Sequence, residues 1–222
     1  LDFNPDNGVR GYQTRLRLPY HTDSSDVVGL LCLKPAKSGG LSSVASTTST
    51  FNEVVKRRPD LAHLWFNQWY YARRNEERPG EKPFFTTPLA HLDDGVLSIR
   101  YVRSFLESAQ RHDEVPQHTT QETEFLDLVD EISHEDGHAL HMDFRPGDIQ
   151  FVCNYTTFHS RTKYEDFDEP AEKRHLLRLW LALHEARSIP DDFGRGSNNG
   201  SGGRGGIAAV PDRAEPMAGT YP

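Results

Sequence analysis

Two residues that commonly bind divalent metals are separated by a single position near the start of the chain. They are His21 and Asp23, in the stretch PYHTDSSD at residues 19–26. The segment YQTRLRLPYHTD alternates polar and apolar residues, which predicts a half-buried β-strand. Side chains at positions i and i+2 of a strand point to the same side, so both groups would reach one point. A surface histidine beside a turn-capping aspartate would give the same pattern.

A second histidine makes this pair informative. His159 occurs in CNYTTFHSRT, directly after DIQFVCN, which has the pattern of a buried strand that could position the side chain rigidly. Two imidazoles and one carboxylate on one face of a metal ion leave three coordination positions open, as in non-haem Fe(II) oxygenases. His21, Asp23 and His159 are therefore the candidate metal ligands and catalytic residues.

Two arginines in the last apolar segment before the Gly-rich C-terminal residues could bind an anion. In RHLLRLWLAL, residues 174–183, a strand would turn leucines outward and direct Arg174 and Arg178 inward. An inward arginine needs an anion, because an unpaired buried charge is very costly. A planar guanidinium suits a carboxylate ligand in particular. A salt bridge to one of the chain's own acids, or a solvated helix face, remains an alternative for both residues.

The elements that would position these side chains are mostly strands. We expect strands at residues 12–23, 27–35 and 41–46, a hairpin at 84–101 with Asp94-Gly95 in its turn, two strands around RPGD at 138–154, and a last strand or helix at 174–183. We expect helices at residues 48–59, 59–66 and 119–135. The prediction is a mainly β fold with helical insertions.

Composition excludes several classes of protein. The chain has 222 residues, 36% of them hydrophobic, and a net charge of −8 that argues against nucleic-acid binding. No apolar run approaches the length of a membrane span, so no membrane association is expected. Two cysteines, Cys32 and Cys153, are too few for a disulfide framework and indicate a reducing, cytoplasmic location. Composition leaves a homo-oligomer open.

Taken together, these motifs resemble a known enzyme family. HTD at residues 21–23, GGLSS at 39–43, RPGDIQF before His159, and the R-x-x-x-R pattern after it are similar to the taurine dioxygenase and clavaminate synthase-like branch of the Fe(II)/2-oxoglutarate dioxygenases. The resemblance runs from about residue 11 to residue 184. It implies a double-stranded β-helix (jelly roll).

The resemblance also implies a function for each candidate residue. Fe(II) would be held by the three candidate ligands. The distal carboxylate of the cosubstrate 2-oxoglutarate would be bound by Arg174 and Ser42. At the position of Ser42 the family often has threonine. Arg178 falls where some members bind an acidic group of the substrate. The implied reaction uses O2 to oxidise a small organic substrate, with an anionic group left open, and releases succinate and CO2. The carboxylate of Asp23 favours hydroxylation over halogenation, since related halogenases have a small residue there.

The resemblance also suggests how the chain is divided. Family members usually have more chain before HTD, so we expect that the N-terminal part of the family fold is missing from this numbering. Residues 1–187 would form the dioxygenase domain, and residues 188–222 a Gly-rich loop and C-terminal tail.

Two alternative functions compete with this interpretation. HEDGH at residues 134–138 matches the zinc-protease pattern H-E-x-x-H, which would make His134, Glu135 and His138 the site of a zinc hydrolase. That motif requires a helix, whereas the helical pattern ends just before it. The second alternative is a non-catalytic jelly-roll binding module, which would not need inward arginines beside a complete set of metal ligands.

Overall fold

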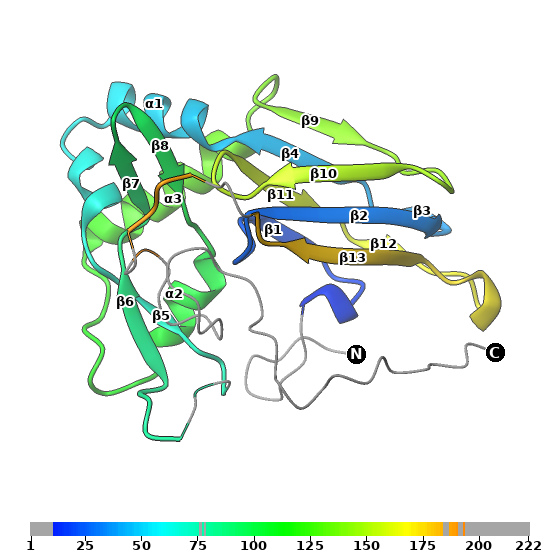
Figure 1. Cartoon of the computed structure of the whole chain (residues 1–222), viewed down its shortest axis with the longest axis horizontal. Helices are drawn as coiled ribbons and strands as arrows, with labels where there is room; N and C mark the ends of the chain where they lie inside the picture. The colour runs from blue at the N-terminus through cyan, green and yellow to red at the C-terminus, as the bar shows by residue number, and fades with distance from the viewer. Residues whose placement is uncertain (1–10, 76, 78, 184–186, 191–192, 194–222) are drawn as a thin grey trace.

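The computed structural model describes residues 11–75, 77, 79–183, 187–190 and 193. Two antiparallel sheets form its framework, and the chain passes repeatedly from one to the other (Figure 1). The four-stranded sheet has the order β1 (Leu18–His21), β11 (Thr157–Arg161), β4 (Ser42–Ser46) and β9 (Ala139–Met142). The three-stranded sheet has the order β10 (Ile149–Cys153), β2 (Val27–Lys34) and β13 (His175–Leu181). This alternation is that of a double-stranded β-helix, so the predicted fold class is confirmed.

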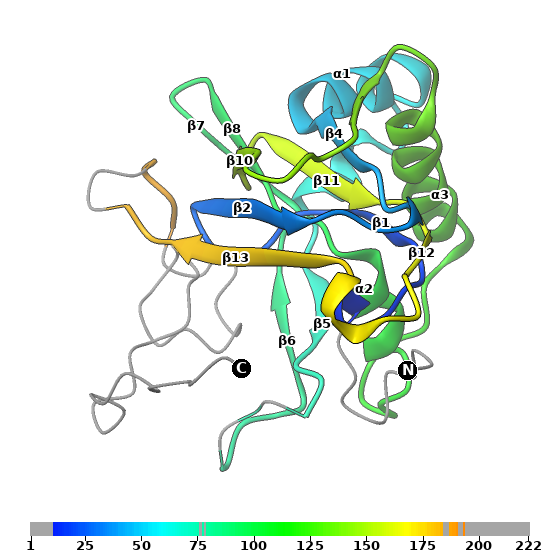
Figure 2. The same cartoon turned by 90° about the vertical axis from the view of Figure 1, so that its right-hand side faces the viewer.

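A long insertion between β4 and β9 contains the helices. Its elements are α1 (Thr47–Arg57), η3 (Ala62–Phe66), β5 (Trp69–Ala72), β6 (Phe84–Thr87), β7 (Ala90–Asp93), β8 (Val96–Ile99), α2 (Arg103–Ala109) and α3 (Thr120–His134). Shorter pieces complete the described fold: η2 (Gly11–Gln13), the paired strands β3 (Ser38–Gly39) and β12 (Tyr164–Glu165), and η4 (Pro170–Glu172). Helices α1 and α3 lie together beside the four-stranded sheet, on the side away from β13 (Figure 2).

The hydrophobic core lies between this insertion and the four-stranded sheet. Tyr20, Ala45 and Phe158 come from the sheet and belong to one buried cluster with Trp65 and Phe125 of the insertion. Phe125 contacts Trp65 edge to face, with ring centroids 5.0 Å apart. Burial of these large aromatic surfaces supplies most of the driving force for folding. The core therefore makes β1, β4 and β11 rigid.

Local sequence explains where the helices begin. Ser46 caps α1, because its hydroxyl accepts a hydrogen bond of 3.2 Å from the backbone N–H of Ser49. A capping box begins α3, where the Thr119 hydroxyl accepts from the Glu122 N–H and the Glu122 carboxylate accepts from the Thr119 N–H.

Two tight turns depend on residues that tolerate left-handed backbone. Asp94 and Gly95 have φ of 44° and 75° and join β7 to β8, which confirms the predicted turn. At Gly39, φ is 71°, and a Cβ atom would lie 2.3 Å from the Lys163 carbonyl oxygen. Only glycine fits at this position, because any side chain would clash with that backbone oxygen.

Three predicted elements were wrong in extent or type. Residues 12–23 form a strand only over Leu18–His21, because η2 occupies the start of the alternating segment. Residues 59–66 contain a short 3-10 helix, Ala62–Phe66, where an α-helix was expected. The predicted hairpin at 84–101 is shorter, because Phe84–Thr87 pairs with β5. Helix α2 was not predicted.

The outer face of the three-stranded sheet is apolar and exposed. Leu177 and Leu179 point outward as predicted, and Leu179 is 64% exposed. Phe151, 66% exposed, lies two strands away on the same face, over Gly29 of β2. None of the described helices is long and apolar enough to cross a membrane.

Candidate metal centre

The structure brings His21, Asp23 and His159 together. One ligand atom from each lies within 4.8 Å of the other two, and no other group of this kind occurs among the described residues. His21 and His159 are directly opposite in the β1–β11 ladder, with ring centroids 4.3 Å apart. The Nε2 atoms of His21 and His159 lie 3.8 and 3.6 Å from the two carboxylate oxygens of Asp23.

The His21 ring is oriented by its own backbone. Its Nδ1 lies 2.8 Å from the carbonyl oxygen of Pro19, so Nδ1–H is the donor and Nε2 carries the free lone pair. Burial, followed by the neighbouring His159, lowers the pKa of His21 to about 4. The imidazole is therefore neutral at neutral pH, as a metal ligand must be.

Asp23 lies beyond the end of β1, so its position does not follow from strand alternation as predicted. Its backbone N–H donates to Asn154 Oδ1 at 3.0 Å. The preceding residue, Thr22, exchanges two hydrogen bonds with Tyr101, its N–H donating at 2.9 Å and its hydroxyl accepting at 3.1 Å. Two contacts with distant parts of the chain therefore fix the loop that directs Asp23 toward His21.

A tryptophan that the sequence analysis missed holds the Asp23 carboxylate. Trp180 of β13 donates its Nε1–H to Asp23 Oδ2 at 2.9 Å. Arg178 Nη1 lies 3.8 Å from the same oxygen, and its guanidinium lies 5.1 Å from the Trp180 ring centroid. Burial alone would raise the pKa of Asp23, but the two imidazoles and Arg178 hold it well below its usual range. The signal that could have identified Trp180 is its place on the Arg178 face of the strand.

Arg174 lies outside this cluster, just before β13. Its guanidinium lies 5.1 Å from the ring centroid of Tyr164, and no carboxylate of the described chain is within 4.0 Å of it. Burial lowers the pKa of Arg174. The hydroxyl of Ser42 donates to Gln150 Oε1 at 3.2 Å. The structure thus shows no hydrogen bond between Ser42 and Arg174.

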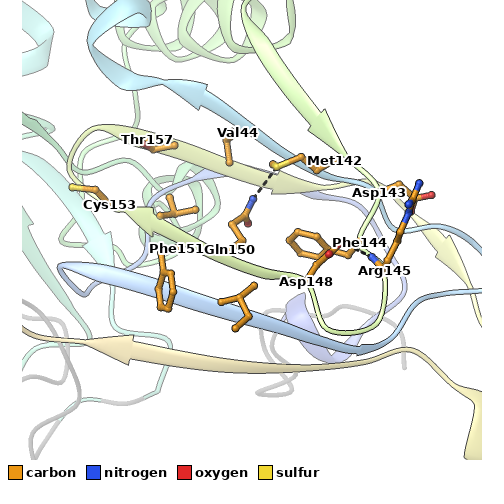
Figure 3. A pocket seen from close by; sticks show the side chains of 12 residues that line it. Val44, Met142, Asp143, Phe144, Arg145, Asp148, Gln150, Phe151, Cys153 and Thr157 are labelled. Atoms are coloured by element: carbon orange, nitrogen blue, oxygen red, sulfur yellow. Dashed lines mark hydrogen bonds between the residues drawn. The ribbon is translucent and has the colours of Figure 1, made fainter.

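A pocket of about 830 Å³ lies along β10, and none of the three candidate ligands lines it (Figure 3). Val44 and Thr157 line it, and Val44 is the register partner of His159 in the β4–β11 ladder. Gln150 and Met142 line its middle and are joined by a hydrogen bond of 3.4 Å. This volume is ample for a small organic molecule.

HEDGH does not form a metal site. Helix α3 ends at His134, and the next residue, Glu135, has an extended backbone and pairs with Arg57. His138 Nε2 lies 3.0 Å from the Thr50 hydroxyl. The two histidines are therefore not one helical turn apart on a common helix, as the zinc motif requires.

The donor set fits a divalent first-row metal. Two neutral imidazole nitrogens and an ionised carboxylate suit Fe(II), and three protein ligands leave positions for further ligands. A structural zinc site would need a fourth protein ligand. No such ligand is present among the residues that the structure describes.

The sequence is similar to a family of dioxygenases. Residues 2–180 match the family described as taurine catabolism dioxygenase TauD, TfdA family. FR-33289 synthase of Streptomyces rubellomurinus is 36% identical over 187 residues, which cover 82% of this chain and 54% of that protein. A taurine hydroxylase-like protein, SAT17, of Stachybotrys chartarum is 32% identical over 177 residues, which cover 78% of this chain and 44% of the relative. The chain thus spans about half the length of these relatives.

Solved structures share the fold. An asparagine oxygenase in complex with Fe(II), a hydroxyasparagine and succinate has a TM-score of 0.58 at 19% identity, covering 78% of this chain and 52% of that one. PvcB of Pseudomonas aeruginosa has a TM-score of 0.55 at 16% identity, covering 81% and 62%. At these identities the likeness establishes the fold alone.

Proposed function

The chain belongs to the TauD/TfdA family of dioxygenases, and from this premise we propose that it is an Fe(II)- and 2-oxoglutarate-dependent dioxygenase. It would hydroxylate a small organic molecule, consume O2, and release succinate and CO2. The observation that carries the proposal is the convergence of His21, Asp23 and His159 within 4.8 Å.

Each residue of the cluster contributes through its charge state and orientation. Fe(II), with 2-oxoglutarate and O2, would supply the oxidising chemistry when bound. His21 and His159 would bind it through neutral nitrogens, and Asp23 through a carboxylate that stays ionised. Trp180 restricts the rotation of that carboxylate by its hydrogen bond to Oδ2. This leaves Oδ1 as the oxygen better placed to bind the metal.

Arg174 would bind the distal carboxylate of 2-oxoglutarate. Its half-buried guanidinium has no carboxylate within 4.0 Å in the described part of the chain, so an anionic ligand would offset the cost of burial. Ser42 would assist by turning its hydroxyl away from Gln150.

The test of the proposed function is a pair of linked measurements on the purified protein. Oxygen uptake and succinate release should both require Fe(II) and 2-oxoglutarate, and neither should be supported by Zn(II). A binding module would show neither dependence. Hydrolysis of peptides in Zn(II), lost on replacement of Glu135, would instead favour the zinc enzyme.

We expect Arg178→Gln to uncouple the reaction, because Arg178 would bind an anionic group of the substrate next to Asp23. Slow succinate release without substrate should persist, as should Fe(II) and 2-oxoglutarate binding. Substrate-stimulated turnover should fall about tenfold, the expected loss for one charge-assisted hydrogen bond. Stimulated and unstimulated succinate release, measured side by side, check this. Loss of 2-oxoglutarate binding in the variant would move Arg178 to the cosubstrate site.

We expect Trp180→Phe to weaken metal binding about tenfold, because outer hydrogen bonds to ligands typically have effects of this size. Titration with Co(II), followed by its visible absorption, measures this without turnover. Trp65→Phe is the matched control, since Trp65 is buried but its Nε1 has no hydrogen-bond partner in the described structure. Equal Co(II) affinity in the Trp180→Phe and wild-type proteins would show that the hydrogen bond does not position Asp23.

A further inference from the structure

Arg100 is a buried cation with no acidic partner among the described residues. Arg100 is only 7% exposed, and its Nε is buried without a hydrogen bond. Within the described residues, no carboxylate lies within 4.0 Å of the guanidinium. Its contacts are with the rings of Tyr71 and Phe85, whose centroids lie 5.5 and 5.8 Å from Cζ. Aromatic faces offset only part of the cost of burying a charge.

The backbone fixes this side chain against the loop that carries Asp23. The N–H of Arg100 donates to the Leu89 carbonyl at 2.8 Å, and the Tyr71 hydroxyl donates to the Arg100 carbonyl at 3.1 Å. The next residue, Tyr101, makes the two hydrogen bonds to Thr22 described above. Arg100 is therefore held rigidly at the edge of the candidate metal centre.

Arg100 and Asp23 line the same small cavity. Its volume is about 10 Å³, which accommodates one group the size of a water molecule. Asn154, also in its wall, uses its amide to bind the Asp23 N–H and Ser25. The Tyr155 hydroxyl donates to Asp26 at 2.9 Å. These side chains are already hydrogen-bonded, whereas the buried Nε of Arg100 has no hydrogen-bond partner among the described residues.

We propose that Arg100 binds an oxyanion group of the substrate, such as a carboxylate, phosphonate or sulfonate, beside the metal centre. This rests on the proposed function. One terminal oxygen of the group would occupy the cavity, and the remainder of the substrate would extend past Asp23 toward the metal. Arg100 would thus share with Arg178 the recognition of acidic substrates, a function distinct from that of Arg174 at the cosubstrate.

The position of Arg100 in the fold supports a substrate function. Arg100, Tyr71 and Phe85 all come from the insertion between β4 and β9, whereas the three candidate metal ligands and Arg174 come from the framework strands or the loops next to them. The balance of charge also favours an anionic ligand. A divalent metal, Arg100, Arg174 and Arg178 together exceed the negative charge of Asp23 and a 2-oxoglutarate dianion by two units. A substrate anion would offset part of that excess.

A structural function for Arg100 predicts a different response to mutation. If the cation–π contacts hold the insertion together, Arg100→Met should destabilise the protein. If Arg100 instead binds an anionic ligand, replacing this unpaired buried charge should leave the unfolding temperature of the ligand-free protein unchanged or raise it. Methionine keeps most of the side-chain volume over Tyr71 and Phe85, so packing loss is small.

The experiment measures thermal unfolding of the purified protein against inorganic phosphate concentration. Phosphate should stabilise the wild-type protein, and Arg100→Met should weaken its apparent affinity at least about tenfold. The matched control is Arg73→Met, because Arg73 also lies over Phe85, at 5.1 Å, but pairs with Glu81. It should keep the phosphate response. Should Arg100→Met fail to fold, Arg100→Lys replaces it, with a smaller loss expected.

A second measurement tests the connection to substrate. Succinate release is compared for carboxylic acids and their primary amides. Arg100→Met should lose stimulation by the acids at least about tenfold, whereas stimulation by the amides should change less than threefold. Unchanged phosphate affinity, or an unchanged preference for acids over amides, overturns the proposal. If the wild-type protein shows no Fe(II)-dependent turnover yet binds phosphate through Arg100, the dioxygenase function fails and the anion site stands.

Discussion

Replacing His159 with alanine is expected to abolish 2-oxoglutarate turnover while leaving the fold intact. The residue is one of three ligands, and its Nε2 lies 3.6 Å from Asp23, so its loss removes a third of the protein's donor set. Two remaining ligands should bind Fe(II) too weakly for the metal to stay in place during turnover. Succinate release at saturating Fe(II), together with circular dichroism, checks both parts of the prediction.

The matched controls are histidines of the rival motif. His134→Ala and His138→Ala should keep turnover within about threefold of the wild-type rate, because their rings contact Asp130 and Thr50 and lie outside the cluster. Near-normal succinate release by the His159→Ala protein would remove His159 from the candidate centre. Loss of turnover in His138→Ala would revive a metal site at HEDGH.

Sequence pattern predicted the strand that ends at His21 and the apolar strand before His159, but not the strand that carries His159. His159 lies on β11, Thr157–Arg161, which follows the predicted strand β10 after a short turn. Asp23 lies near His21, as predicted, but strand alternation does not place it there, because it lies beyond the end of β1. Asp23 reaches its position because Asn154, 131 residues away, binds its backbone. Contacts at that separation have no signature in the local spacing of residue types.

Trp180 and Arg100 show the same limit. Trp180 reads as one more apolar residue of a strand, and its function depends on an oxygen 157 residues away. Arg100 lies at the end of a hairpin, where a solvated arginine is the ordinary expectation. Only tertiary packing shows that it is buried and unpaired. Residue type and alternation in the sequence can therefore identify candidate ligands on the framework strands. Residues that orient those ligands, or that bind a substrate beside them, can be identified only from the tertiary structure.

Arg174→Lys is expected to weaken 2-oxoglutarate binding by between tenfold and about a hundredfold. A charge-assisted hydrogen bond contributes about 1.5–3 kcal/mol, and lysine cannot reproduce the paired hydrogen bonds of a guanidinium. The Arg174 guanidinium also contacts Tyr164, with 5.1 Å between Cζ and the ring centroid, which restricts its rotamers before the ligand binds. Lysine would lose that preorganisation. Titration with 2-oxoglutarate under anaerobic conditions in Mn(II) measures the affinity without turnover.

Arg161 supplies the control that separates this effect from a general disturbance of the region. Its guanidinium lies 4.8 Å from the centroid of the same Tyr164 ring. Unlike Arg174, it donates to the carbonyl oxygens of Thr14 and Leu16. Arg161→Lys should lower the unfolding temperature, because the two carbonyls lose their donor, and should change 2-oxoglutarate affinity less than threefold. Unchanged affinity in Arg174→Lys would remove Arg174 from the cosubstrate site. Equal losses of 2-oxoglutarate affinity in both variants would mean that the Tyr164 region affects binding through packing. A direct ion pair with the cosubstrate predicts a loss in the Arg174 variant alone, although both arginines contact the same ring.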